Sequence, residues 1–193
     1  MSFHRYAFWS FVSNIFSSIE MVMSSHSMLA VVSKSGPEAL MTANYLLKDM
    51  VGQLGGIAYV SKLGSTIDKN PHQIAIRSIA YQQVAMFAEC ITPLTPSYFL
   101  PIASCANVVQ NISFIGLGGV NARIIKKLSD ESCQIGEVYS KISVINTAGS
   151  TIGMLLGLGL VTKIPDHTTR LALFPFIAYG RVVSYNMSIK NLL

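Results

Sequence analysis

Two long stretches of this sequence contain no charged residue. The first covers residues 90–122, a run of 33 residues between Glu89 and Arg123, and the second covers the 21 residues 142–162. A helix needs about 20 predominantly apolar residues to cross the hydrocarbon core of a bilayer. Both stretches meet this requirement, so we expect membrane-spanning helices over about 97–119 and 142–162.

The composition supports a membrane environment. Hydrophobic residues make up 51% of the chain and charged residues 12%, whereas about 25% of a typical soluble domain is charged. A chain with so little charge hides much of its surface in lipid, in partner proteins or in both. The net charge of +5 comes from basic residues scattered along the chain, without the basic stripe that nucleic-acid binding favours. We therefore expect no nucleic-acid partner, and anionic lipids or acidic protein partners match this charge better.

Apolar residues recur at three- and four-residue steps, which is typical of α-helices, and no alternation typical of strands persists. Proline and glycine divide the chain into about six helical segments: 5–32, 37–63, 71–91, a fourth after Pro96, a fifth after Lys141 and a sixth over 167–190. We predict an all-α fold with a single domain over 1–193, a helical bundle embedded in or associated with a membrane. Residues 64–66 are expected to end the second helix, and Pro175 is expected to break the last.

Three amide side chains interrupt the first uncharged stretch. Asn107, Gln110 and Asn111 lie three and four residues apart, and an amide that faces lipid tails is costly. We therefore expect these side chains to face neighbouring helices.

Two single carboxylates lie in apolar segments, Asp49 and Glu89. Ionisable groups in apolar helices are often functional. The other interpretation is an ion pair with Arg77 or Arg123, and the sequence leaves both open.

The sequence contains no residue pattern typical of a catalytic or metal site. Its four histidines and three cysteines are widely separated, with no Cys-x-x-Cys pair. We therefore expect no enzyme activity, no cofactor and no metal. The glycine-rich run at 116–119 lacks the strand and helix that frame a nucleotide-binding loop, so we interpret it as a helix crossing.

Glycines at four-residue spacing are the strongest packing signal in the chain. Gly149, Gly153 and Gly157 make two successive Gly-x-x-x-Gly steps in the second uncharged stretch. Small residues at this spacing form a groove that lets another helix approach closely, whether within the chain or in a partner. The same role is expected of Gly52, Gly56, Gly116 and Gly119.

Residues around this pattern share the offsets of a known family motif: Glu137, Lys141, Thr147, Gly153 and Gly157. On these residues the chain resembles the root UV-B sensitive family, whose conserved domain of unknown function is also labelled for vitamin B6 photoprotection and homeostasis. Residues 48–55, 85–94 and 116–123 resemble further family blocks. The similarity runs from about Tyr6 to Leu160.

The resemblance implies a largely helical, membrane-associated protein of plastids or mitochondria, linked in plants to light responses and vitamin B6 status. It supplies no reaction and no catalytic residues. Residues 144–146 are Val-Ile-Asn where the family has Ser-Gln-Glu. Family members commonly carry an added C-terminal region that is absent from this sequence.

The N-terminal region is open to two interpretations. It holds Arg5, several serines and no acidic residue before Glu20, which loosely resembles a mitochondrial targeting helix. The other interpretation, an ordinary amphipathic first helix, is favoured.

We derive three functional hypotheses from these features. The first is a non-catalytic accessory subunit of a complex in the mitochondrial inner membrane, packed through its glycine-rich helix. The second is a small transporter or carrier-like protein, with a polar path between the fourth and fifth helices lined by Asn107, Gln110, Asn111, Arg123 and Lys141. The third is a binding protein for a vitamin B6 compound, in which Lys48 or Lys141 would supply the amine.

Overall fold

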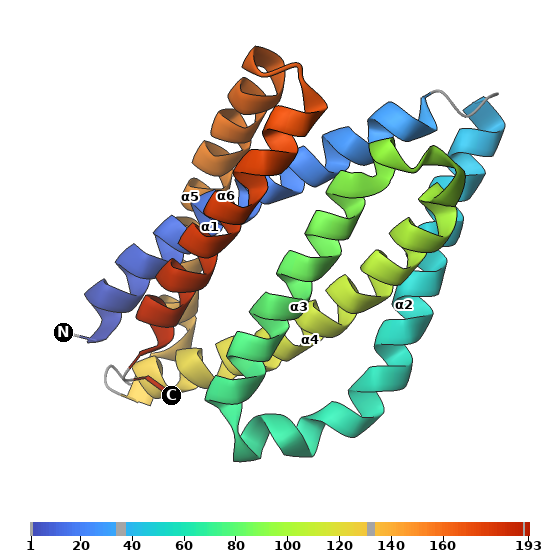
Figure 1. The fold of residues 1–193 in the computed structure, drawn as a ribbon. Helices are drawn as coiled ribbons and strands as arrows, with labels where there is room; N and C mark the ends of the chain where they lie inside the picture. Colours follow the sequence, from blue (N-terminus) through green and yellow to red (C-terminus); the bar gives the residue numbers. More distant parts are fainter. Residues whose placement is uncertain (1, 34–37, 131–133, 191) are drawn as a thin grey trace.

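The structure is a computed structural model that describes residues 2–33, 38–130, 134–190 and 192–193. Over these residues it contains six α-helices and no β-strand, which confirms the all-α prediction (Figure 1). The helices are α1 (Ser2–Val32), α2 (Glu38–Lys69), α3 (Pro71–Ile91), α4 (Phe99–Asp130), α5 (Ile135–Lys163) and α6 (His167–Ile189). Two short 3₁₀ turns, η1 (Thr92–Leu94) and η2 (Pro96–Tyr98), join α3 to α4.

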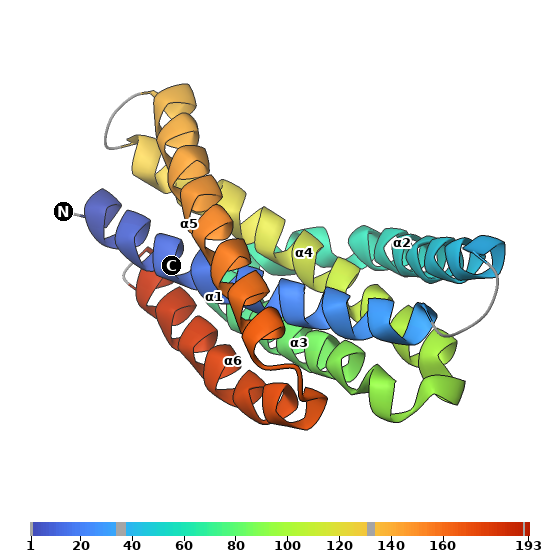
Figure 2. The ribbon, with the colours of Figure 1, turned by 90° about the horizontal axis from the view of Figure 1, so that it is seen from above.

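The six helices form two units of three. In the first unit, α1 packs against both α5 and α6, and in the second unit, α4 packs against both α2 and α3. The units meet where α3 lies beside α1 and α6; Figure 1 shows this division, and Figure 2 shows from above that α5 crosses over α1. The last turns of α1 also contact the second unit, where Met28 and Val32 pack against Phe99 and Ala103 of α4.

The apolar core is divided into separate clusters. One contains Tyr6, Ile124 and Ile142, at the end of the molecule that holds both termini. Another contains Ile19, Met86 and Phe174. Along α1, the segment between Tyr6 and Ile19 is polar on the side that faces the second unit. A polar binding site can therefore form in the space between these two apolar clusters.

Two helix boundaries differ from the prediction. Residues 64–66 do not end the second helix, because α2 continues to Lys69. It stops before Pro71, since the residue before a proline is kept out of the α-region, and Asn70 has a ψ of 64°. Pro175 lies inside α6 and does not break it. A proline removes one backbone hydrogen bond, but α6 packs against both α1 and α3, and this packing holds the helix together.

Three helical segments are long and apolar enough to cross a membrane by length and composition: Phe3–Val32, Pro96–Asp130 and Ile135–Lys163. The second and third contain the two spans predicted from the sequence. The first is an additional candidate that was not predicted, because serines and Glu20 interrupt its apolar pattern. Its mean hydropathy is nevertheless no lower than that of the second span.

Candidate functional site

A stripe of polar side chains runs along α1. Its members recur at three- and four-residue spacing and therefore share one helix face: Ser10, Ser13, Ser17, Glu20, Ser24 and Ser27. All except the half-buried Ser17 are buried. This stripe was not predicted from the sequence, although its spacing is as regular as that of the apolar residues. The stripe faces both units, because Glu20 contacts Arg181 of α6 and Gln83 of α3.

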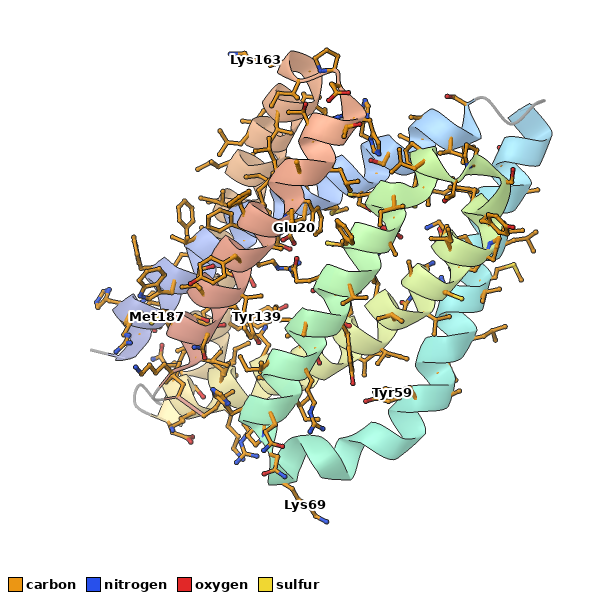
Figure 3. The ribbon with its side chains drawn as sticks, viewed as in Figure 1. Glu20, Tyr59, Lys69, Tyr139, Lys163 and Met187 are labelled. Atoms are coloured by element: carbon orange, nitrogen blue, oxygen red, sulfur yellow. The ribbon has the colours of Figure 1, made fainter. Side chains whose placement is uncertain are left out.

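Glu20 and Arg181 form an ion pair in the middle of the molecule, where Figure 3 shows Glu20 between the first unit and α3. The Arg181 Nη1 atom lies 2.7 Å from Glu20 Oε2, and the two side chains are 5% and 0% exposed. Arg181 Nη2 donates to Gln82 Oε1 at 2.6 Å, and Gln83 Nε2 donates to Glu20 Oε2 at 3.1 Å. Both charges thus belong to the first unit, and α3 contributes neutral groups, the amides of Gln82 and Gln83 and the sulfur of Met86.

This cluster is incompletely hydrogen-bonded. Among the residues that the structure describes, Arg181 Nε, Glu20 Oε1 and Gln83 Oε1 are buried without a hydrogen-bond partner. An unsatisfied buried polar atom destabilises a protein by about 1–3 kcal/mol. The cluster therefore holds one donor and two acceptors that are unpaired among the described residues.

A cavity of about 300 Å³ adjoins the ion pair. Arg181 and Gln82 lie on its wall together with hydroxyl and amide side chains from four helices: Tyr6, Ser10, Ser13, Asn14, Ser17, Asn121, Asn146 and Tyr185. The Tyr6 hydroxyl donates to Asn121 Oδ1 at 3.0 Å, and Ser10 Oγ donates to Asn146 Oδ1 at 2.8 Å. The volume is at the lower end of the range for small-molecule pockets.

A second polar contact joins the two units beyond the ion pair. The Ser24 hydroxyl donates to the carboxylate of Glu89, which is buried on α3. Burial raises the pKa of the Glu89 carboxyl above its ordinary value of 4.5, and the Ser24 hydrogen bond and the nearby Lys48 oppose this by less. Glu89 is thus bound by a serine hydroxyl and does not form the predicted ion pair with an arginine.

Replacing Glu89 with glutamine should remove one source of pH dependence in stability. Because the folded-state pKa is raised, the contribution of Glu89 to stability is fully present below the ordinary value of 4.5 and is lost as pH rises through the folded pKa. The wild type should therefore lose stability relative to Glu89→Gln between acidic and neutral pH, as followed by thermal unfolding in detergent. Glu137→Gln, at an exposed carboxylate, is the control. A pH-independent difference between wild type and Glu89→Gln would contradict the raised pKa.

The glycines of α5 lie directly against α1. An added Cβ would lie 2.7 Å from the Phe11 carbonyl oxygen at Gly149 and 2.9 Å from Val22 Cβ at Gly157. At Gly153 it would collide with the carbonyl oxygen of Ile15. The partner of this glycine face is therefore a helix of the same chain.

The glycines of α2 lie against the amides of α4. An added Cβ at Gly52 would lie 2.6 Å from Asn107 Cγ, and at Gly56 3.3 Å from Asn111 Cβ. Asn107 Nδ2 also donates to Asp49 Oδ1 at 2.9 Å. The amides face a neighbouring helix, as expected from their spacing.

The ion partner of Asp49 is its neighbour Lys48, with Nζ and Oδ1 2.7 Å apart. This corrects the predicted pairing of Asp49 with Arg77 or Arg123. Because Lys48 and Asp49 are adjacent on α2, their side chains can pair without a contact between helices. Lys48 itself is buried.

The remaining predicted glycines occupy two different environments on α4. An added Cβ at Gly116 would lie 3.4 Å from Ser78 Cβ, so α3 packs closely there. Gly119 lies with Arg123 and Lys126 on the wall of a separate hollow near the end of α4.

The predicted polar path between α4 and α5 is not assembled. Asn107 and Asn111 face α2, whereas Lys141 is exposed on α5 and pairs with Glu137 one turn away. Arg123 is exposed near the end of α4, and Gln110 is half-buried. The reason is geometric, because α4 turns the face that carries its asparagines toward α2. The cavity beside Arg181 is the polar site that the structure assembles in its place.

Cysteine and metal chemistry have little support in the described part of the chain. No group of three or more His, Cys, Asp and Glu side chains there could hold a metal ion. Cys90 is buried, and burial raises its pKa to about 12, so its thiol is unreactive. Cys105 is exposed, and Cys133 lies outside the described residues.

The sequence matches the model of a known protein family. The family model of the vitamin B6 photo-protection and homoeostasis domain matches residues 1–192. The chain belongs to this family. The match confirms the resemblance drawn from the motifs around Gly153 and extends it over the C-terminal helix. No solved structure matches the chain.

Several curated proteins are similar to this vitamin B6 photo-protection and homoeostasis domain. Root UVB sensitive 4 of Arabidopsis thaliana is 27% identical over 90% of this chain and 34% of its own length. Root UVB sensitive 5 of the same plant is 31% identical over 89% of the chain and 35% of its own length. RUS family member 1 of Dictyostelium discoideum is 24% identical over 85% of the chain and 32% of its own length. The chain thus spans about a third of the length of these relatives.

Proposed function

We propose that this chain is the helical core of a membrane protein that binds a small polar solute between its two units and moves it across the membrane. The observation that carries the proposal is the buried Glu20–Arg181 pair on the edge of a polar cavity. Charged groups inside a membrane bundle are costly, and they mark substrate paths, proton relays or ligand sites. Glu20 lies within a helix long and apolar enough to cross the membrane.

The contacts within and between the units support movement at the cavity. Within each unit, helices cross closely at glycines: Gly153 lies against the backbone of Ile15, and Gly52 lies against the side chain of Asn107. Between the units, hydrogen bonds such as Tyr6 to Asn121 beside the cavity and Ser24 to Glu89 beyond it accompany the apolar cluster of Met86. The Glu20–Arg181 pair stays within one unit. The units can therefore separate beside the cavity without separating these two opposite charges.

Thiol labelling tests this function without knowledge of the solute. With the three native cysteines replaced by alanine, we expect Ser17→Cys, on the cavity wall, to react with a hydrophilic thiol reagent in reconstituted vesicles. Met21→Cys is the control, because Met21 is 52% exposed on the same helix and away from the cavity wall, where lipid would exclude the reagent. Equal protection of both cysteines in the folded protein would reject a water-filled cavity.

A second candidate function is the accessory subunit of an organellar membrane complex. The observation that favours it is the apolar outer face of α5, where Leu155 is 66% exposed and Leu158 55% exposed. Such a face fits another membrane helix as well as lipid. Migration on a native gel in mild detergent tests it, because a sharp band at monomer size argues against a complex.

The proposed location is an organellar membrane, with the mitochondrial inner membrane as first choice. The serine-rich segment that contains Arg5 and precedes Glu20 supports it. One similar protein, root UVB sensitive 2 of Arabidopsis thaliana, is described as chloroplastic, so cell fractionation should include plastids where they occur. Anionic lipid headgroups are proposed partners of the exposed Arg123 and Lys126.

A further inference from the structure

We propose that the cavity beside Arg181 selects an uncharged solute rich in hydroxyl or amide groups and excludes the phosphorylated form of the same molecule. This inference rests on the proposed function, because it names the chemical class that the cavity accepts. It is carried by the charge balance and the hydrogen-bonding groups of the cavity wall.

The first argument is the charge of the wall. Among the described residues that line the cavity, Arg181 is the one that carries a charge. Its guanidinium is already neutralised by Glu20, with 2.7 Å between Nη1 and Oε2. A phosphate or carboxylate that entered would therefore lose its water without gaining an unbalanced positive partner, which is strongly unfavourable. A cation would meet no acidic side chain on the described wall.

The second argument is the hydrogen-bonding capacity of the wall. Serine hydroxyls and asparagine amides both donate and accept, and they supply most of the polar lining, for example Ser13, Ser17 and Asn121. Burial raises the pKa of Tyr185, so its hydroxyl stays neutral and keeps its proton. Groups of this kind match hydroxyls and amides, which have the same dual character.

The third argument is the unsatisfied donor of Arg181. The side chain of Arg181 is 5% exposed, and its Nε–H has no hydrogen-bond partner among the described residues. A hydroxyl or carbonyl oxygen of a neutral solute that reaches this buried donor would accept its hydrogen bond and relieve the cost of leaving it unpaired. Such a hydrogen bond would orient the bound solute without adding net charge to the cavity.

Matched pairs of probes test the inference: pyridoxine against pyridoxine 5′-phosphate, and sorbitol against sorbitol 6-phosphate. The readout is protection of Ser17→Cys from the hydrophilic thiol reagent, in the full chain in vesicles. We expect at least one neutral probe to protect and its phosphorylated partner to bind at least about tenfold more weakly. Equal or tighter binding of the phosphorylated partners overturns the inference. Protection by none of the four probes also overturns it.

Two variants give the cavity wall an excess positive charge and should therefore gain affinity for the phosphorylated probes. Glu20→Gln leaves Arg181 without its counter-ion, and Ser17→Lys places a new cation on the wall. We expect binding of the phosphorylated probes to rise in at least one of them, measured by microscale binding to purified protein. If Glu20→Gln does not fold, Ser17→Lys decides, because it leaves the ion pair intact. An unchanged preference in the folded variant overturns the inference.

The outcomes separate this inference from the proposed function. If Ser17→Cys is unreactive, then the water-filled cavity is wrong and the proposed function fails. If Ser17→Cys reacts but the phosphorylated probes protect it best, then the cavity exists and the inference about solute charge alone is wrong.

Discussion

Replacing Arg181 with methionine is expected to lower the free energy of unfolding by about 3–5 kcal/mol, because it leaves a buried carboxylate without its partner. Glu20 has no exposed side-chain surface, and its Oε2 atom is shared by Arg181 and Gln83. Methionine keeps a long apolar side chain, so the loss reports mainly the missing charge. Unfolding in mixed micelles with increasing SDS gives the free energy.

Neutralising both partners should recover most of this loss. In Glu20→Gln/Arg181→Met no uncompensated charge remains, and a neutral replacement of a buried pair is often tolerated. The exposed pair of Lys141 and Glu137 provides a matched control, because Lys141→Met should cost only about 0.3–0.5 kcal/mol. A loss in Arg181→Met as small as that in Lys141→Met would show that the buried pair is not formed.

Adding one methyl group at Gly153 is expected to separate α5 from α1. The new Cβ would collide with the Ile15 carbonyl oxygen and lie 2.8 Å from Ser18 Cβ. The backbone of α1 must shift to make room, and overpacking of this kind costs about 1–3 kcal/mol. Gly153→Leu should prevent folding. Because Glu20 follows Ser18 by two residues, a shift of α1 should also reduce protection of the cavity by bound solute.

Gly159→Ala is the matched control on the same helix. Apart from the adjoining turns of α5 itself, no described atom lies within 4 Å of an added Cβ at Gly159, and alanine favours a helix over glycine by about 1 kcal/mol. This propensity gain is common to both variants, so the difference in their melting temperatures isolates the cost of packing at Gly153. Equal melting temperatures would mean that α1 does not approach α5 at this glycine.

Several helix-level features could be predicted because they depend on neighbours in the sequence. The spacing of Gly149, Gly153 and Gly157 indicated a packing face, and Asn107 and Asn111 were expected to face another helix. Both expectations use only the repeat of about 3.6 residues per turn. The boundary errors at 64–66 and Pro175 have the same origin, because local breaking signals were not weighed against packing over the whole helix.

The candidate site could not be predicted in this way. Glu20 and Arg181 are 161 positions apart, and neither belongs to a motif. The polar path predicted between α4 and α5 combined side chains that point in different directions. The serine stripe of α1 was the signal that could have been used, because its regular spacing predicts a polar face inside an apolar helix.

By itself, the sequence determined that the chain is helical, that its long uncharged segments have membrane length, and that Gly149, Gly153 and Gly157 form a close-packing face. These properties depend on helix periodicity and residue size, which are local. Only the tertiary structure decided that α1 fills the glycine groove of α5 and that Glu20 meets Arg181 beside a polar cavity. The reason is that a helix face selects its partner through shape and charge complementarity along its whole length, and residues far apart in sequence supply that complementarity.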